Sequence, residues 1–557
     1  MGFVRMLGFA LVALTLTLFT WLGGGFVSTW LTPWSLWLTL LLVEVMLVLP
    51  EQSQTESLFE ARRRVWHSLV RDPLLWLTLA LTLYLLLQWL NACTVLDWNV
   101  KSQQWTIDSP AFEFMRHPDT ATALALPPPD RMVASWKFFP ATISWLPWSL
   151  RSGEAWDVMN WFPPVLFALL LVRHAMQNQT KRRLLTFVCA MTMLLSIVGI
   201  VQYLMEAEFL YWGRPVGAFF YATFGYPNHA ACFFPAVMAL SIGLWMWARE
   251  HQEQTRVPAF FYLICALLCA VSGVLSGSRA GVLFVLAVGA FSTLYVVVRW
   301  YRLWSPRLRW AIPSVLMLFL FVIGGTFAFR LYAVKANQRF TEMSTVAKTE
   351  EERSIAGRLP RFTTLPMIDP VLQEIAETDW AEFLAHPMLM RAGYQGILAM
   401  RQHTAYPWYG SGAWSFRWLN AHYIDRTKPE EAAWLRNRLG VGQANVHNDT
   451  LQFLAEHGRI GFALMLGCLA ALLFPFLKRL WQSPSLCNAD ERLECSWLNR
   501  LNVAMVFIFV ATTLIALHSF IDLVFRSPAC MMLYGLMFVC APGLIVGYAQ
   551  TKEKAHA

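Results

Sequence analysis

The part of the sequence best suited to chemistry is Asn445–Gly461, NVHNDTLQFLAEHGRIG, which lies directly before a long apolar run. His447 there carries an imidazole, a group that can take a proton from a hydroxyl group. Asp449 or Glu456 could orient that ring, and Asn448 adds a further polar group. A histidine and an aspartate two residues apart could also bind a metal ion, but two ligands do not make a site. We therefore interpret His447 as a candidate general base and expect no metal.

The same stretch has the pattern of a helix that enters a membrane. Leu451, Leu454 and Ile460 fall near helical spacing. Gly458 and Gly461 give the chain freedom to bend before the apolar run. The alternative to a catalytic role is an interfacial helix whose polar residues simply face water.

Two arginines stand in short polar stretches between apolar runs. Arg214 lies in YWGRPVGAFF, upstream of Asn228 and His229 at the start of the next run, and Arg279 lies in LSGSRAG. A guanidinium group with little water around it favours an anionic partner, and its fork can hold two phosphate oxygens. Two such guanidinium groups would suit a pyrophosphate. The alternatives are an ordinary loop position for Arg214, and snorkelling to the interface or a helix C-terminal role for Arg279.

Two further segments carry polar or aromatic groups. His518 and Asp522 lie in HSFIDLVFRSP, where they could instead form hydrogen bonds between helices. The segment 406–416, YPWYGSGAWSF, has tryptophans that could stack on sugar rings. Its Gly410 and Gly412 predict a tight turn against another backbone.

The composition is typical of polytopic membrane proteins. Of the 557 residues, 57% are hydrophobic and 14% are charged, with 27 Trp and 39 Phe, which is far from the average of soluble domains. The formal net charge of +9 could suggest nucleic acid, but the basic residues form short clusters between apolar runs. Because such clusters orient membrane proteins, we expect membrane lipids around the chain and no nucleic-acid partner.

Taking about 17 to 22 apolar residues as one crossing, we predict an all-α polytopic membrane protein with about twelve transmembrane helices. They cover residues 6–22, 31–49, 74–90, 159–172, 184–205, 228–248, 258–275, 281–298, 311–330, 459–477, 501–517 and 529–549. The first is interpreted as a retained span, because no convincing cleavage site follows it. Basic clusters occur at every second connection, with roughly twenty Lys and Arg against about three in the short loops of the other side. Both termini are therefore expected in the cytoplasm.

These spans divide the chain into four regions. Residues 1–183 form an N-terminal transmembrane region with an external loop at about 91–158, and residues 184–330 form a central transmembrane region that carries the arginine motifs. Residues 331–458 form a large external loop that is expected to be helical. Residues 459–557 hold the C-terminal transmembrane helices and a short cytoplasmic tail. No tandem or inverted repeat is visible, which disfavours a transporter.

The order of the motifs resembles the O-antigen ligase and polymerase superfamily, whose members share a Wzy-type C-terminal domain. The motifs are R-x-x-G, P-N-H, G-S-R-A-G, P-x-x-G-x-G, H-N-D-x-L-x-x-L-x-E-x-G and H-S-x-x-D, beginning at Arg214, Pro227, Gly277, Pro407, His447 and His518. The resemblance covers about residues 200–545, whereas residues 1–180 match only as apolar spans.

The resemblance implies a GT-C-like glycosyltransferase that moves a glycan from undecaprenyl-pyrophosphate to an acceptor at the periplasmic face of the bacterial inner membrane. It implies that Arg214 and Arg279 bind the donor pyrophosphate and that His447 activates the acceptor hydroxyl. The attack would invert the anomeric centre and need no metal or other cofactor. The supporting residues would be Asn228, His229, Asn448, Asp449, Glu456, His518 and Asp522.

The acceptor stays open, because the loop at about 91–158 has no counterpart in the superfamily. A glycolipid acceptor, as in O-antigen ligases, is the leading hypothesis. A second lipid-linked glycan would make the protein an O-antigen or exopolysaccharide polymerase, and a protein acceptor would make it an O-oligosaccharyltransferase. All three share the donor chemistry, so donor motifs do not separate them. A polysaccharide transporter is the alternative from a different class.

Overall fold

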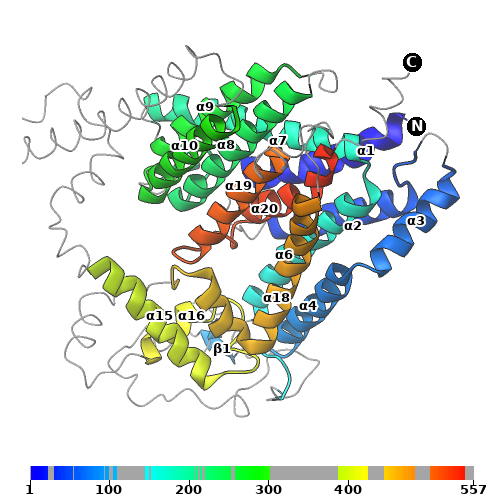
Figure 1. Cartoon of the computed structure of the whole chain (residues 1–557). Coiled ribbons are helices and arrows are strands. Elements are labelled where there is room, and N and C mark those ends of the chain that lie inside the picture. The colour runs from blue at the N-terminus through cyan, green and yellow to red at the C-terminus, as the bar shows by residue number, and fades with distance from the viewer. Residues whose placement is uncertain are drawn as a thin grey trace, which may run out of the picture. The chain divides into compact units, whose positions relative to one another are not determined.

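The computed structural model describes residues 2–22, 31–53, 56–92, 95–99, 104–108, 143, 145–149, 152–205, 207, 209–210, 214–215, 220–251, 257–300, 387–423, 445–482 and 502–545. These residues are mostly helical, with two short two-stranded antiparallel ribbons (Figure 1). The chain forms two compact units. Unit 1 comprises Met1–Val188, Met390–Gln482 and Ile515–Ala557, and unit 2 comprises Cys189–Leu389 and Ser483–Leu514.

Unit 1 contains most of the helices that the structure describes. They are α1 (Gly2–Thr17), the π-helical turn η1 (Leu18–Leu22), α2 (Leu31–Val48), α3 (Leu58–Val70), α4 (Pro73–Leu90), α6 (Ser152–Ala175), α15 (Pro387–Ala405), α16 (Phe416–Leu419), η7 (Asn420–Tyr423), α18 (Asp449–Gln482), α20 (Pro528–Cys540) and η10 (Ala541–Leu544). Helix α6 packs against α2, α4 and α20, and α18 packs against α4. The strands β1 (Val95–Asn99) and β2 (Gln104–Asp108) form a hairpin.

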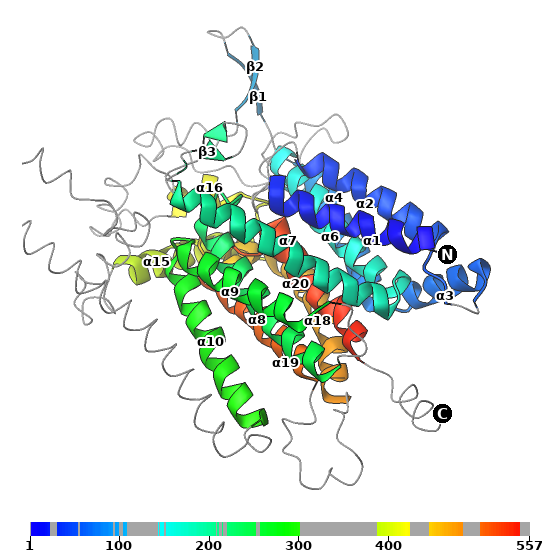
Figure 2. The same cartoon turned by 90° about the horizontal axis from the view of Figure 1, so that it is seen from above.

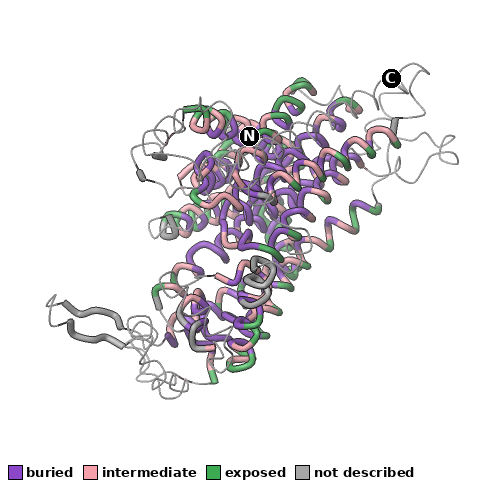
Figure 3. The backbone as a smooth tube through the Cα atoms, turned by 90° about the vertical axis from the view of Figure 1, so that its left-hand side faces the viewer, coloured by how far each residue is buried: buried purple, intermediate pink, exposed green. Residues whose placement is uncertain are grey.

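Unit 2 is built around α8 (Pro227–Glu250), which packs against α9 (Ala259–Leu275) and α10 (Arg279–Trp300) (Figure 2). Nearly all residues of α8 are buried. Figure 3 shows the buried residues of the described chain in purple. The short strands β3 (Phe209–Leu210) and β4 (Arg214–Pro215) precede α8 in the sequence and pair with each other. Helices α7 (Asn178–Leu204) and α19 (Val503–Ser519) each contribute residues to both units.

The fold is that of a helical membrane protein. Six helices are long and apolar enough to cross a membrane: Pro73–Leu90, Gly153–Ala175, Asn178–Leu204, Pro227–Glu250, Ala280–Val298 and Asp449–Trp481. Five shorter apolar helices match other predicted spans: Met6–Leu22, Trp34–Val48, Ala259–Leu275, Val503–Ser519 and Pro528–Leu544. The predicted span 311–330 and most of the predicted loop 331–458 lie outside the described residues. The count of twelve spans therefore stays a prediction.

The fourth predicted span is longer than the sequence suggested. We expected residues 159–172, whereas α6 begins at Ser152 and ends at Ala175. Its first turns are helical because Ala155 and Val158 are buried against neighbouring elements, which offsets the polar residues between them. The predicted external loop therefore ends earlier than residue 158.

Local signals fix the corner between α3 and α4. Ser57 and Glu60 form a reciprocal capping box at the start of α3, and Asp72 caps α4. The Asp72 carboxylate also accepts a hydrogen bond from Arg173 (2.8 Å) and lies 2.7 Å from His174 Nε2. Because Arg173 and His174 end α6, this carboxylate ties the corner to the helix at the centre of unit 1.

Helix α18 bends at Gly458, whose φ of 62° and ψ of −171° are not helical. The turn at 407–412 packs against this bend, with Gly410 and Gly412 at positive φ. The backbone N–H of Gly412 donates to the carbonyl of Glu456 at 2.7 Å. The structure confirms both predictions, the bend before the apolar run and the glycine turn against another backbone.

Two polar side chains of α4 hold the bend in place. The Tyr84 hydroxyl lies 2.7 Å from the Tyr409 carbonyl and 2.6 Å from the His457 carbonyl. Gln88 donates to the Tyr409 carbonyl (3.2 Å), and its Oε1 lies 2.9 Å from His457 Nδ1. These two side chains of an apolar helix thus satisfy backbone and ring groups at the bend, as burial in a membrane protein requires.

Substituting Gly458→Ala is expected to destabilise unit 1 strongly. A Cβ there would lie 2.4 Å from the Trp408 carbonyl oxygen and 2.5 Å from Gly410 N. The backbone conformation costs a non-glycine residue about 1–3 kcal/mol, and the forced contact adds roughly 1–3 kcal/mol. Thermal unfolding in nanodiscs measures the loss. Gly289→Ala is the control, because nothing lies within 4 Å of its Cβ, and equal midpoints for the two variants would contradict this account of the bend.

Candidate functional site

His447 stands immediately before α18 in a strained backbone conformation. Its φ is 54°, in the left-handed region that few residues other than glycine adopt. Its Nδ1 lies 3.2 Å from Asp522 Oδ1, and the side chains of His447 and Asp522 are 34% and 4% exposed. Backbone strain of this kind is concentrated at functional sites. The result is a partly exposed imidazole in contact with a buried carboxylate.

The residues on either side of His447 fix its position. Asn448 caps α18, because its Oδ1 accepts a backbone N–H of the first turn at 2.9 Å. Its Nδ2 donates to the Phe520 carbonyl at 2.9 Å. On the other side, the backbone N–H of Val446 donates to Gln452 Oε1 at 2.9 Å. The histidine backbone is therefore anchored to α18 and to the segment that follows α19.

The turn after α19 holds Asp522 toward His447. The backbone N–H of Asp522 donates to the His518 carbonyl at 2.8 Å, and its Oδ1 accepts the Leu523 N–H at 2.7 Å. Burial raises the pKa of the Asp522 carboxyl, but the hydrogen bond and charge of His447, with a smaller effect of His518, hold that pKa below its ordinary value. The structure thus brings His447, His518 and Asp522 together, a grouping that the sequence analysis did not predict.

The low pKa of Asp522 predicts a particular acid dependence of stability. The carboxylate stabilises the fold fully above about pH 4, and this contribution is lost as pH falls through the folded-state pKa. At pH 5, Asp522→Asn should therefore be less stable than the natural protein by about 1.5–3 kcal/mol, the range for a hydrogen bond to a charged group. The difference should shrink below pH 4. Unfolding midpoints at pH 5, 4 and 3 measure it, and a difference that stays constant would contradict the paired carboxylate.

Asp449 and Glu456 do not orient His447, so that prediction is wrong. Asp449 Oδ2 accepts the Phe525 N–H at 2.7 Å, and Glu456 Oε2 accepts Arg526 Nη2 at 2.5 Å. The reason is geometric. Residues 449 and 456 are two helical turns apart on one face of α18, whereas His447 precedes the helix and its left-handed backbone directs it to Asp522.

Arg526 is the principal residue that the sequence reading missed. It is paired with Glu456, and these side chains are 13% and 1% exposed. Its guanidinium carbon lies 4.0 Å from the centroid of the Trp414 ring, and that of Arg417 lies 4.5 Å from the same ring. The Trp414 ring thus contacts two arginine side chains. The sequence had suggested only that the tryptophans of this segment could stack on sugar rings. The segment HSFIDLVFRSP could have indicated Arg526, because an arginine between two apolar helices requires a partner.

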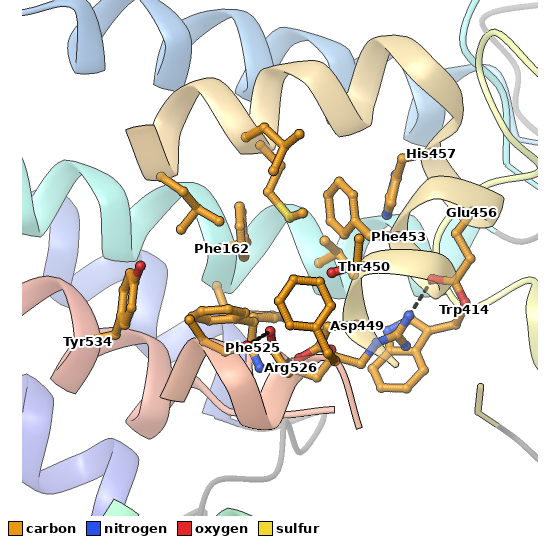
Figure 4. Close-up of a pocket in the computed structure, with 18 residues that line it drawn as sticks. Phe162, Trp414, Asp449, Thr450, Phe453, Glu456, His457, Phe525, Arg526 and Tyr534 are labelled. Carbon is orange, nitrogen blue, oxygen red and sulfur yellow. Dashed lines mark hydrogen bonds and ion pairs between the residues drawn. The ribbon is translucent and has the colours of Figure 1, made fainter. Parts of the chain in front are cut away.

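A cavity of about 830 Å³ lies beside this ion pair (Figure 4). Its walls come from α6, α18, the end of α19 and α20. Apolar side chains such as Phe162, Met465 and Leu469 line most of it, whereas Asp449 and Arg526 lie at one end. The cavity is therefore amphipathic along its length.

The arginine motifs belong to unit 2, where two of them are in contact. Ser278 of the G-S-R-A-G turn donates to Asn228 Oδ1 at 2.5 Å, and Asn228 Nδ2 donates to the Tyr226 hydroxyl at 3.1 Å. His229 is buried at the start of α8, with its ring centroid 5.0 Å from that of Tyr226. Gly281 permits α10 to begin close to α9, because a Cβ there would lie 2.4 Å from the Gly273 carbonyl. The P-N-H and G-S-R-A-G motifs thus form one local structure.

The two arginines are placed by their backbones alone. Arg279 is the first residue of α10, and Arg214 begins β4; their side chains lie outside the described part of the structure. Arg279 therefore starts a helix, which contradicts the C-terminal role considered for it. The N-terminus of a helix carries partial positive charge and favours an anion.

Comparison with known proteins returned no match to any protein-family model or to any curated protein. Within the described residues, no group of three or more His, Cys, Asp or Glu side chains is arranged to hold a metal ion. The described part of unit 1 offers a histidine–aspartate pair and a buried arginine–glutamate pair beside an amphipathic cavity. Unit 2 offers a helix start at Arg279.

Proposed function

We propose that this protein is a membrane-embedded glycosyltransferase of the O-antigen ligase type, with a GT-C-like fold of about twelve spans. It transfers a glycan from undecaprenyl-pyrophosphate to an acceptor hydroxyl at the periplasmic face of the bacterial inner membrane. The observation that carries the proposal is the contact between His447 Nδ1 and Asp522 Oδ1 at the edge of a helical membrane protein. A buried carboxylate that fixes one ring nitrogen orients the other for proton transfer.

The proposed reaction is a single displacement. The acceptor oxygen attacks the anomeric carbon of the donor sugar, while His447 Nε2 takes the hydroxyl proton. The bond between the anomeric carbon and the pyrophosphate oxygen breaks, and its electron pair leaves with undecaprenyl pyrophosphate. Asp522 stabilises the imidazolium that forms, and attack from the opposite face inverts the anomeric centre. No metal is required for these steps.

Arg214 and Arg279 are proposed to hold the donor pyrophosphate. The leaving group gains negative charge in the transition state, so guanidinium groups stabilise that state more than the ground state. The location of Arg279 at the N-terminus of α10 supports this role. The contact between Asn228 and Ser278 supports it further, since it fixes the turn from which Arg279 emerges.

Arg279→Gln should lower transfer by about 10²–10³-fold, the range for removing one donor to a developing anion. The rate of transfer from a defined lipid-pyrophosphate glycan measures the effect. Arg249→Gln, at the last turn of α8, is the matched control and should retain full activity. If both variants transfer equally well, Arg279 does not contact the donor.

Removal of the gene identifies the acceptor. Loss of long glycan from lipid A core, with carrier-linked polymer accumulating, indicates the ligase. Glycans shortened to single units would instead indicate a polymerase, and unglycosylated pilin or a similar protein would indicate an O-oligosaccharyltransferase. Glycan movement across vesicles without cleavage of the carrier bond would indicate a transporter and overturn the proposal.

A further inference from the structure

The cavity in unit 1 has an apolar part and a polar end that differ sharply in chemistry. Phe162 of α6 lines the apolar part, and Asp449 and Thr450 lie toward the polar part (Figure 4). Met465 and Leu469 of α18 add apolar side chains to the lining. The space between its walls, counted with its open mouth, is about 830 Å³. A ligand that matches both parts has a hydrocarbon chain and a polar head.

The charges at the polar end disfavour an anionic head. The guanidinium of Arg526 is already paired with Glu456 at 2.5 Å and stacked on Trp414. Asp449 adds a carboxyl group, which accepts the backbone N–H groups of Phe525 and Val524. A phosphate placed here would meet the Glu456 carboxylate and an arginine that this carboxylate already neutralises. Like charges placed together cost several kcal/mol, whereas hydroxyl groups could donate to Asp449 and bond with Thr450.

Two observations indicate that this cavity accommodates a ligand. The indole Nε1 of Trp161, which lines the cavity, is buried and has no hydrogen-bond partner among the described residues. A buried donor of this kind calls for an acceptor. In addition, Leu466 and Phe520 line the cavity and are 46% and 54% exposed. The apolar lining therefore reaches the surface of the described structure, which gives a hydrocarbon chain a route of entry.

We propose that this cavity binds a single-chain amphiphile with an uncharged, hydroxyl-bearing head group. The chain lies along Met465 and Leu469, and the head bonds with Asp449 and Thr450. This site differs in charge from the one proposed for the donor pyrophosphate, and its occupancy does not depend on glycan transfer.

A matched pair of probes tests the head-group preference. The full-length protein in nanodiscs is labelled by a dodecyl glucoside that carries a photoreactive diazirine on its chain, and the labelled peptides are mapped by mass spectrometry. Labelling of α18 near Leu469 is expected. Unlabelled dodecyl glucoside should compete at least about tenfold better than dodecyl phosphate, since the phosphate adds a like charge. Equal competition would overturn the head-group preference.

Filling the cavity tests its location. Leu469→Trp should abolish the labelling, whereas Phe474→Trp, on the exposed face of the same helix, should leave it unchanged. Ala516→Leu fills the cavity from α19 and should also abolish the labelling. It replaces Leu469→Trp in the experiment if that variant does not fold. Labelling that persists in both filled variants would show that the probe only samples bulk lipid, and the site would be rejected.

Changing the charge tests the reason for the preference. Glu456→Gln leaves Arg526 without its carboxylate partner, so dodecyl phosphate should become the better competitor. The double variant Glu456→Gln with Arg526→Gln should restore the preference for the glucoside. If Glu456→Gln keeps the original preference, the ion pair does not set the selectivity. All of these experiments measure binding of the amphiphile. A negative result therefore does not contradict the proposed transfer reaction, and a protein without transfer activity can still bind the amphiphile.

Discussion

The variant His447→Asn is expected to lower the rate of glycan transfer by about 10²–10⁴-fold, the range for loss of a general base. Asparagine suits the position because it tolerates the left-handed backbone (φ 54°) better than most residues. Its amide can also donate to Asp522, which keeps that carboxylate paired. The variant thus removes the proton acceptor while preserving the backbone conformation. Transfer from a lipid-pyrophosphate glycan in nanodiscs measures the loss.

The control for this experiment is His67→Asn, because His67 is exposed on α3. Full activity is expected from the control, and both proteins should unfold at nearly the natural midpoint. A His447→Asn protein that is folded and transfers at the natural rate would remove His447 from the mechanism.

Arg526→Met should destabilise the protein by about 3–5 kcal/mol. The substitution leaves Glu456, which is 1% exposed, as a buried charge without its partner, and breaking a buried ion pair costs about this much. It also removes the guanidinium that lies over the Trp414 ring. The unfolding midpoint in nanodiscs measures the loss.

The matched variant combines Arg526→Met with Glu456→Gln. Glutamine can still bond with Gln452, which donates to Glu456 at 2.8 Å, so the double variant should recover most of the lost stability. Recovery separates the cost of an unpaired charge from the cost of lost packing. If the double variant is no more stable than the single one, the ion pair does not dominate the energetics of this region.

Local patterns in the sequence predicted the elements that depend on local chemistry. Apolar runs located the helices, and the bend at Gly458 followed from a glycine in front of such a run. The turn with Gly410 and Gly412 was also predictable, because glycines in an aromatic segment imply a close backbone approach. Each of these signals acts within a few residues of the feature that it specifies.

The pairings at the site could not be read from the sequence, because they join distant segments. Asp522 lies 75 residues from His447, and Arg526 lies 70 residues from Glu456. Sequence proximity favoured Asp449 as the partner of His447, but the helical face turns Asp449 toward Phe525. The early start of α6 was missed for a related reason, since burial by neighbouring helices overrides the polar character of its first turns.

The most direct measurement of the central claim uses purified full-length protein in nanodiscs, a synthetic undecaprenyl-pyrophosphate glycan and a hydroxyl-bearing acceptor. Transfer should release one undecaprenyl pyrophosphate for each glycan moved, and nuclear magnetic resonance of the product should show the inverted anomeric configuration. Release should require the acceptor and should fail in His447→Asn. An intact carrier bond after prolonged incubation, with the glycan moved only across the bilayer, would contradict the transferase and favour a transporter.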